Sequence, residues 1–306
     1  MGSAGDWGVM MEVREQPISL TDNPPRRMRL HGSSSVWLVP LGGFVALFLV
    51  IPAISLLWGS LHGLTGQWTW TNYRSLLQPQ YLDAYRTSIA LSLGTAIIGG
   101  LAGLGLAWLI SGHHAPGWLR SLITTFSGVA SNFAGIPLAF AFTATIGPVG
   151  LVTVLLEKTV GFNPYRHGLT LFNLGGLAVT YLYFQIPLGV LVLVPVLDAL
   201  SRYGEAAANL GAGRGQFWLR VGWPTVRRPL FGTLVLLFAN SFGAYATAYA
   251  LTSGMINLVP ILIGQELSGN VFFSPGLGDA LAMGMIGVMA LAWSIQQILL
   301  GERDRT

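Results

Sequence analysis

The sequence predicts an all-α, polytopic membrane protein with six transmembrane helices and a cytoplasmic helix-turn-helix loop. Of its 306 residues, 52% are hydrophobic and only 9% are charged, and its mean hydropathy is +0.60. A soluble domain carries about 25% charged residues, so this chain lacks the polar surface that water requires. The absence of cysteine excludes disulfides, thiol catalysis and cysteine-ligated metals.

Six apolar stretches are long enough to cross the bilayer, which takes about 20 helical residues at a rise of about 1.5 Å each. We expect one membrane domain over residues 36–300, with spans at 36–59, 87–111, 122–146, 174–200, 230–252 and 277–300. Two further apolar pieces, 149–156 and 256–263, are too short to span and are expected to lie at the interface or to pack on other helices.

The basic residues predict the orientation of these spans. With the N-terminus inside, twelve arginines fall on the cytoplasmic side, and only Arg74, Arg86, Lys158 and Arg166 fall outside. Residues 1–35 then form a flexible cytoplasmic tail, since no apolar core precedes its arginines as in a signal peptide. Residues 301–306 form a cytoplasmic C-terminal tail. The net charge of +4 is spread over loops and tail and does not indicate nucleic-acid binding.

The loop between the fourth and fifth spans, residues 201–228, has a pattern of its own. A run of strong helix formers begins at Glu205 and ends at Gly211, where only glycine takes the left-handed cap without penalty. Residues 216–221 predict a second short helix that Pro224 closes, because proline cannot continue a helix. Glu205 is expected near the N-terminus of the first helix, where the dipole favours a carboxylate.

This loop resembles the EAA loop of type I ABC importer permeases, the membrane subunits of binding-protein-dependent uptake systems. The family pattern has Glu-Ala-Ala, a glycine four positions later, and an aliphatic residue and a proline further on. Trp223 stands where the family usually has leucine, which keeps an apolar contact but makes it bulkier. The positions that match are Glu205, Ala206, Ala207, Gly211, Val221 and Pro224.

The resemblance implies a transport subunit of the bacterial inner membrane. It would pair with a second permease subunit, paralogous or identical, and work with an ABC ATPase dimer and an extracytoplasmic substrate-binding protein. The loop would fit a cleft on the ATPase, with Arg214 meeting acidic groups there or lipid headgroups. ATP and Mg²⁺ would bind the ATPase, and this chain would bind no cofactor.

The residues themselves favour a subunit that is not an enzyme. The phosphate-binding loop of an ATPase needs a glycine-rich turn followed by lysine, and the single lysine, Lys158, follows Glu157 with no such turn. The adjacent His113 and His114 would point about 100° apart on a helix and are expected in a cytoplasmic turn. We therefore expect neither a catalytic site nor a metal site.

Polar residues within the spans are candidates for the translocation path, because they are costly in lipid and normally face a packed interface or a water-filled path. Interhelical hydrogen bonding that only holds the bundle together is the alternative. Gly99 and Gly103, four residues apart, predict close helix packing. The path candidates are Asn132, Gln185, Asn240, Ser241 and Tyr245.

Of the predicted properties, the transported solute is the one that the sequence specifies least. Residues 71–77 after the first span, and the segment from Phe242 onward, are similar to the branch of the family that imports spermidine or putrescine, phosphonates, iron, sulfate or molybdate. A polyamine-like or phosphonate-like cargo is the expectation, with sugar, ferric iron and sulfate or molybdate as alternatives. An ion-coupled secondary transporter or a membrane scaffold is the alternative of another class, but the spans have few charges and the loop has no place in that scheme.

Overall fold

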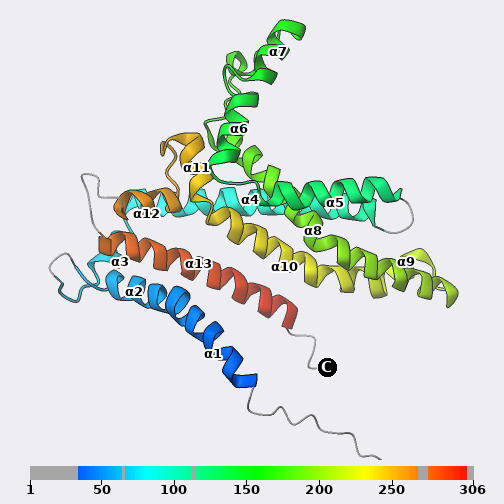
Figure 1. The fold of residues 1–306 in the computed structure, drawn as a ribbon, viewed down its shortest axis with the longest axis horizontal. Coiled ribbons are helices and arrows are strands. Elements are labelled where there is room, and N and C mark those ends of the chain that lie inside the picture. Colours follow the sequence, from blue (N-terminus) through cyan, green and yellow to red (C-terminus); the bar gives the residue numbers. More distant parts are fainter. Residues whose placement is uncertain (1–33, 64–65, 112–114, 268–274, 302–306) are drawn as a thin grey trace, which may run out of the picture. The chain divides into compact units, whose positions relative to one another are not determined.

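The computed structural model describes residues 34–63, 66–111, 115–267 and 275–301, and Figure 1 shows its elements. The expected tails 1–35 and 301–306, except for their innermost residues, and His113 and His114 therefore lie outside the described residues. The chain divides into two compact units, Met1–Ile51 and Pro52–Thr306. Each is treated by itself below.

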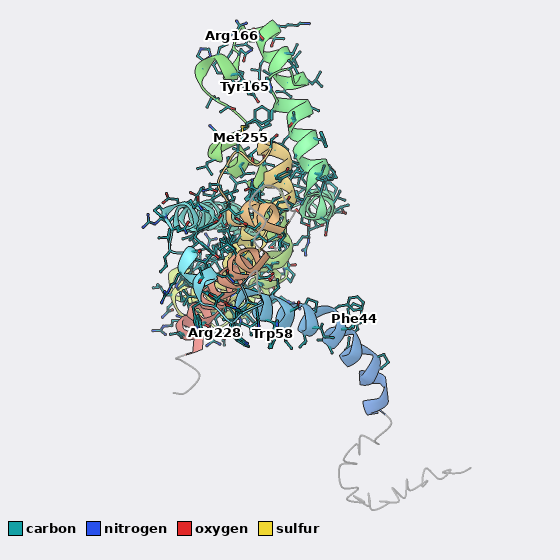
Figure 2. All side chains as sticks on the ribbon, turned by 90° about the vertical axis from the view of Figure 1, so that its left-hand side faces the viewer. Phe44, Trp58, Tyr165, Arg166, Arg228 and Met255 are labelled. Atoms are coloured by element: carbon teal, nitrogen blue, oxygen red, sulfur yellow. The ribbon has the colours of Figure 1, made fainter. Side chains whose placement is uncertain are left out.

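The first unit contains α1 (Ser34–Val45) and the π-helical segment η1 (Ala46–Val50). From Leu41 onward its large apolar side chains are exposed, and the ring centroids of Phe44, which Figure 2 labels, and Phe48 lie 4.8 Å apart. An exposed apolar helix of this kind suits contact with lipid. The first predicted span is confirmed as a candidate span, because Pro40–Ser60 is long and apolar enough to cross a membrane.

The centre of the second unit is formed by three long helices, α4 (Pro79–Ile110), α8 (Leu174–Asn209) and α10 (Trp223–Phe242). Glycine lets α4 and α8 approach closely. A Cβ on Gly103 would lie 3.0 Å from the Cα of Gly189, and one on Gly99 would lie 2.9 Å from the Cβ of Gln185. These small residues therefore pack the helices, as the glycine pattern predicts.

The third predicted span, 122–146, is wrong as one continuous helix. The chain instead forms α5 (Gly117–Asn132) and α6 (Ile136–Ile146), which is followed by α7 (Leu151–Val160). The break arises because Gly135 takes φ 75°, which only glycine adopts readily, and because Pro137 opens the next helix. Together α6 and α7 form the candidate span Ile136–Val160, so residues 149–156 belong to a longer apolar helix pair than predicted.

The fifth predicted span, 230–252, is also broken. Here α10 ends at Phe242, and α11 (Tyr245–Thr252) continues at an angle of 48°. If this bent pair is one span, the described residues contain up to six candidate spans, and otherwise five. The six predicted spans therefore agree with the structure when this bent pair is counted as one span.

Four further helices complete the second unit near the start of α4. These are α2 (Ile51–Ser60, of which Pro52 onward belongs here), α3 (Thr71–Ser75), α12 (Val259–Leu267) and the long α13 (Pro275–Gly301). Asn72 of α3 donates to the carbonyls of Ser60 and His62, at 2.9 and 3.0 Å. The amide of Val259 donates to Ser88 Oγ at 2.9 Å, which fixes the start of α12 on α4.

The segment between α7 and α8 has a polar network of its own. Glu157 pairs with Arg166 at 3.0 Å and accepts a hydrogen bond from Asn163 at 2.8 Å. The hydroxyl of Tyr165 in the 3₁₀ turn η2 (Pro164–His167) donates to the carbonyl of Ile146 at 2.8 Å, and burial raises the pKa of this phenol. Figure 2 labels Tyr165 and Arg166 in this segment.

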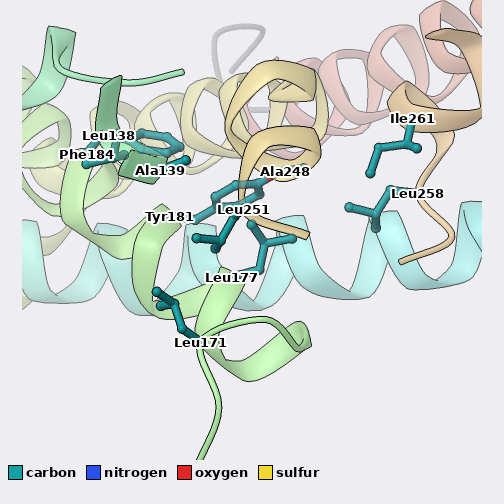
Figure 3. Close-up of a cluster of buried hydrophobic side chains, with 10 residues drawn as sticks. All are labelled: Leu138, Ala139, Leu171, Leu177, Tyr181, Phe184, Ala248, Leu251, Leu258 and Ile261. Carbon is teal, nitrogen blue, oxygen red and sulfur yellow. The ribbon is translucent and has the colours of Figure 1, made fainter. Parts of the chain in front are cut away.

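Apolar cores hold the second unit together at both ends. The cluster in Figure 3 joins α6, α8, α11 and α12 through residues such as Leu138, Tyr181, Leu251 and Ile261. At the other end, a cluster that we call the lower core joins α4, α8 and α10. The buried members of the lower core are Ala107, Ile110, Val190, Leu193, Val194, Leu197, Leu200, Val226 and Leu230.

Candidate coupling loop and translocation path

The turn at Gly211 is built as the sequence predicts. Gly211 takes φ 79°, its amide donates to the carbonyl of Ala208 at 2.9 Å, and the amide of Ala212 donates to that of Ala207 at 3.0 Å. This pair of bonds is the Schellman arrangement, which satisfies carbonyls that the helix end would leave free. The chain therefore reverses at Gly211 with its backbone groups paired.

The predicted first helix of the loop is wrong as a separate element. Helix α8 runs unbroken to Asn209, so Glu205 lies in its last turns rather than at a helix N-terminus. Gly204 lies inside this helix, and a Cβ built on it would lie 3.6 Å from the ring of Phe217, so that ring lies against α8. The helix dipole therefore does not stabilise the Glu205 carboxylate, since carboxylates are favoured at the N-terminal end of a helix.

The predicted end of the second helix at Pro224 is also wrong. Helix α9 (Arg214–Phe217) passes through the π-helical segment η3 (Trp218–Gly222) directly into α10. Pro224 lies in the first turn of α10, where a missing N–H costs little. The loop is thus a tight turn that joins α8 to the continuous helical run of α9, η3 and α10.

The surface of this turn is apolar as well as charged. Leu210 and Leu219 are 88% and 79% exposed, and Trp218 and Trp223 are partly exposed. The residues matched to the family pattern vary in exposure, with Glu205 and Ala206 exposed and Ala207, Val221 and Pro224 half-buried. Exposed leucines beside charged groups are typical of a protein interface. The sequence pattern did not single out Leu210 or Leu219.

Behind the turn lies a cavity of about 760 Å³ between the ends of α4 and α8 and the helix α9. Glu205 and Arg214 lie on it together with Trp108, Phe217 and Trp218. The buried hydroxyl of Ser111 lines it as well. The ring of Phe217 lies against Gly204 of α8 at the edge of this cavity.

Two path candidates lie inside the helix bundle. Gln185 is fully buried, and its Nε2 donates to Thr95 Oγ1 of α4 at 3.0 Å. Ser241 is 2% exposed and donates within α10 to the carbonyls of Leu237 and Phe238. In this conformation both groups serve helix packing, the alternative that the sequence left open.

The other three path candidates are exposed, and each lies next to a helix break. Asn132 ends α5, Asn240 lies in the last turn of α10, and Tyr245 begins α11 and stacks on Tyr249 with ring centroids 5.4 Å apart. Irregular backbone at membrane depth is tolerated where protein buries it or where it lines a water-filled cavity. The structure thus groups three neutral polar side chains at the two broken spans.

The breaks are held by contacts that sequence reasoning missed. The amide of Gly135 donates to Thr247 Oγ1 at 2.8 Å, which joins α6 to α11. The hydroxyl of Tyr181 on α8 donates to the carbonyl of Ala244 at 3.0 Å. The sequence did not indicate that Gly135 and Tyr181 form these bonds, because their partners lie in distant segments of the chain.

An ion pair between Arg120 and Asp198 was also missed. It joins the start of α5 to α8. An aspartate within an apolar stretch is a signal that sequence reasoning could have used. Over the residues with defined structure, no group of three histidine, aspartate or glutamate side chains could hold a metal ion.

No family profile matches the chain. It is 29% identical over 210 residues to the sulfate transport system permease protein CysT of Escherichia coli, covering 66% of this chain and 69% of that protein. It is 24% identical to the sulfate transport system permease protein CysW of Synechocystis, covering 81% and 86%. A crystal structure of a bacterial ABC transporter involved in alginate import contains a chain of the same fold, with a TM-score of 0.68, 16% identity and coverage of 89% and 96%. The helical fold, the apolar spans and these relatives identify the chain as a permease subunit of the type I ABC importer family.

Proposed function

We propose that the chain forms part of the path for sulfate or a chemically similar oxyanion, together with a second permease subunit. The observation that carries this proposal is its similarity, along 62–82% of its length, to eight permeases whose names specify sulfate transport. An extracytoplasmic binding protein would deliver the anion, and an ATPase dimer would bind ATP and Mg²⁺. These relatives move the preference from polyamine-like or phosphonate-like cargo to sulfate.

The chemistry of the exposed path candidates supports an anion. Asn132, Asn240 and Tyr245 are neutral, and their amide N–H and phenol O–H groups can donate hydrogen bonds to an oxyanion. A cationic polyamine would instead be expected to meet carboxylates along its path. Gln185 and Ser241 would reach the cargo only if α4, α8 and α10 separated, so we propose them as packing groups.

The turn around Gly211 is proposed to dock on the ATPase. Leu210 and Leu219 would supply apolar contact beside the family-pattern residues, and Arg214 would meet acidic groups on the partner. Because the turn joins α8 directly to α10, closure of the ATPase would move two helices of the core together. The residues proposed to couple the chain to the ATPase are Glu205, Ala206, Ala207, Gly211, Arg214, Val221 and Pro224.

This docking requires the turn to lie in the cytoplasm. The basic residues near it, Arg120, Arg202, Arg220, Arg227 and Arg228, support that orientation. With six spans, both termini then lie on the same side, and residues 1–35 and 301–306 become cytoplasmic tails of the 36–300 domain.

Uptake of radiolabelled sulfate into proteoliposomes tests the cargo. The chain would be reconstituted with the ATPase, permease partner and binding protein encoded beside it. We expect ATP-dependent sulfate uptake that excess molybdate or thiosulfate reduces and spermidine does not. Uptake of spermidine or a phosphonate, with none of sulfate, would restore the expectation from sequence. Uptake driven by an ion gradient without the ATPase would instead support a secondary transporter.

Co-purification tests the docking role separately from the cargo. The variant Glu205→Arg with Gly211→Asp should still reach the membrane but should lose both the ATPase and uptake. If the ATPase still co-purifies and uptake persists, the turn is not the docking element.

A further inference from the structure

Helix α5 begins beside the part of α8 that leads to the turn around Gly211, which we call the coupling turn after its proposed role. Arg120 lies in the first turns of α5, and its Nη2 donates to Asp198 Oδ2 of α8. Asp198 precedes Glu205 by seven residues, which is about 10 Å along the same helix at about 1.5 Å per residue. The ion pair therefore joins α5 to α8 close to the turn that is proposed to receive the ATPase.

Partial burial makes this pair stronger than a surface ion pair. The side chains of Arg120 and Asp198 are 42% and 25% exposed, whereas those of the Arg86–Asp83 pair on α4 are 80% and 65% exposed. Exposed pairs contribute little because water and salt screen them. A half-buried arginine–carboxylate bond is less screened and also sets direction, since the donor must point at the acceptor.

The α5–α8 interface combines apolar packing with open space. An apolar crevice of about 370 Å³ lies between α4, α5 and α8. Its walls include Leu122, Phe126 and Ser127 on α5 and Pro187 and Val190 on α8. Apolar contacts across such a space are non-directional, so they resist separation of the helices more than sliding between them. A directed ion pair resists sliding.

By contrast, α8 is tightly fixed to the other core helices. The lower core packs α8 against α4 and α10, and Gly103 and Gly189 bring the backbones of α4 and α8 together. Movement of α8 would therefore carry α4 and α10 with it through packing. Helix α5, which leads into the broken span at Gly135, also packs along α8, with Ile123 against the lower core, and the ion pair adds a directed bond between these two helices near the turn.

We propose that Arg120 and Asp198 are positioning residues that transmit movement of the coupling turn to α5, and through α5 to the break at Gly135. The inference rests on the proposed docking role of the turn. It predicts that neutralising the pair uncouples α5 from ATP binding while α8 still responds. It thereby separates a role in transmission from a role in stability, which would affect both helices alike.

Distances between spin labels on the assembled transporter test this. The chain has no cysteine, so Val129→Cys on α5 and Tyr203→Cys on α8, each paired with Leu291→Cys on α13, place labels at exposed positions only. Each pair would be measured without nucleotide and with a non-hydrolysable ATP analogue. The backgrounds would be wild type, Asp198→Asn, the charge swap Arg120→Asp with Asp198→Arg, and Asp83→Asn as a matched control from the exposed pair.

In wild type and in Asp83→Asn, both label pairs should change distance when the ATP analogue binds. In Asp198→Asn, the α8 change should persist, the α5 change should be lost, and the charge swap should restore it. The proposal would be overturned if the α5 label distance still changed fully in Asp198→Asn. It would also be overturned if that distance change were lost and a charge swap that still assembles did not restore it. If α8 does not respond even in wild type, the docking role of the turn fails instead. An Asp198→Asn chain that does not assemble would assign the pair to folding and would also overturn the proposal.

Discussion

Replacing Gly211 with alanine tests the coupling turn through backbone geometry alone. No other heavy atom lies within 4 Å of the position that a Cβ on Gly211 would occupy, so the added methyl group causes no clash. The cost comes from φ 79°, because an L-residue in the left-handed region costs about 1–2 kcal/mol. This corresponds to a roughly 5–30-fold smaller population of the native turn, and the apparent affinity for the ATPase should fall by up to that factor.

Affinity of the detergent-solubilised permease for its ATPase, measured by biolayer interferometry, is the assay. Gly211→Asn should lose less affinity than Gly211→Ala, because asparagine tolerates the left-handed region better. Gly215→Ala is the matched control, since Gly215 lies in α9 without positive φ and also has open space around it. If Gly211→Ala binds the ATPase as tightly as wild type does, the conformation at Gly211 does not govern docking, and the reasoning fails.

Three further predictions concern packing within the bundle. Gly103→Ala should destabilise the protein by about 1–3 kcal/mol, because the new Cβ would lie 3.0 Å from the backbone of α8. Gly105→Ala is the control, since it has open space around it and should leave the melting temperature in detergent unchanged. Tyr181→Phe removes the hydroxyl bond to the α10–α11 break and should cost about 0.6 kcal/mol, and at most about 1.7 kcal/mol, in an SDS-unfolding titration. Gln185→Met loses the Nε2 bond to Thr95 but also removes the buried Oε1, which has no hydrogen-bond partner, so stability and sulfate uptake should stay near normal. Lost uptake in a stable variant would return Gln185 to the path.

The two helix breaks could not be predicted from hydropathy along the chain. Hydropathy placed spans over 122–146 and 230–252, yet both are interrupted, at Gly135 and after Phe242. Glycine and proline near these points permit a break but do not require one, as Pro187 and Pro195 show by lying inside the unbroken α8. The bonds that hold the breaks, from Thr247 and Tyr181, come from other helices.

The coupling turn shows the opposite case. Gly211 was predicted as a left-handed cap from its place after a run of helix formers, and it has φ 79° together with the two backbone bonds of the Schellman arrangement. The extent of the adjoining helices was not predicted, because the first helix was expected to begin near Glu205 and the second to end at Pro224. Phe217 packs against Gly204, and the π-helical segment leads Pro224 into the first turn of α10.

Sequence alone indicated the membrane class, the apolar spans and the turn at Gly211, while the orientation and the coupling role that it suggests stay predictions. These properties depend on composition, local charge and short-range backbone preference, which are all read along one dimension. Only the tertiary structure decided that Gln185 and Ser241 are buried, that Asn132 and Asn240 are exposed beside helix breaks, and that Arg120 meets Asp198. Whether a polar side chain faces a path or a neighbour depends on which helices pack against it, and that packing joins residues far apart in the chain.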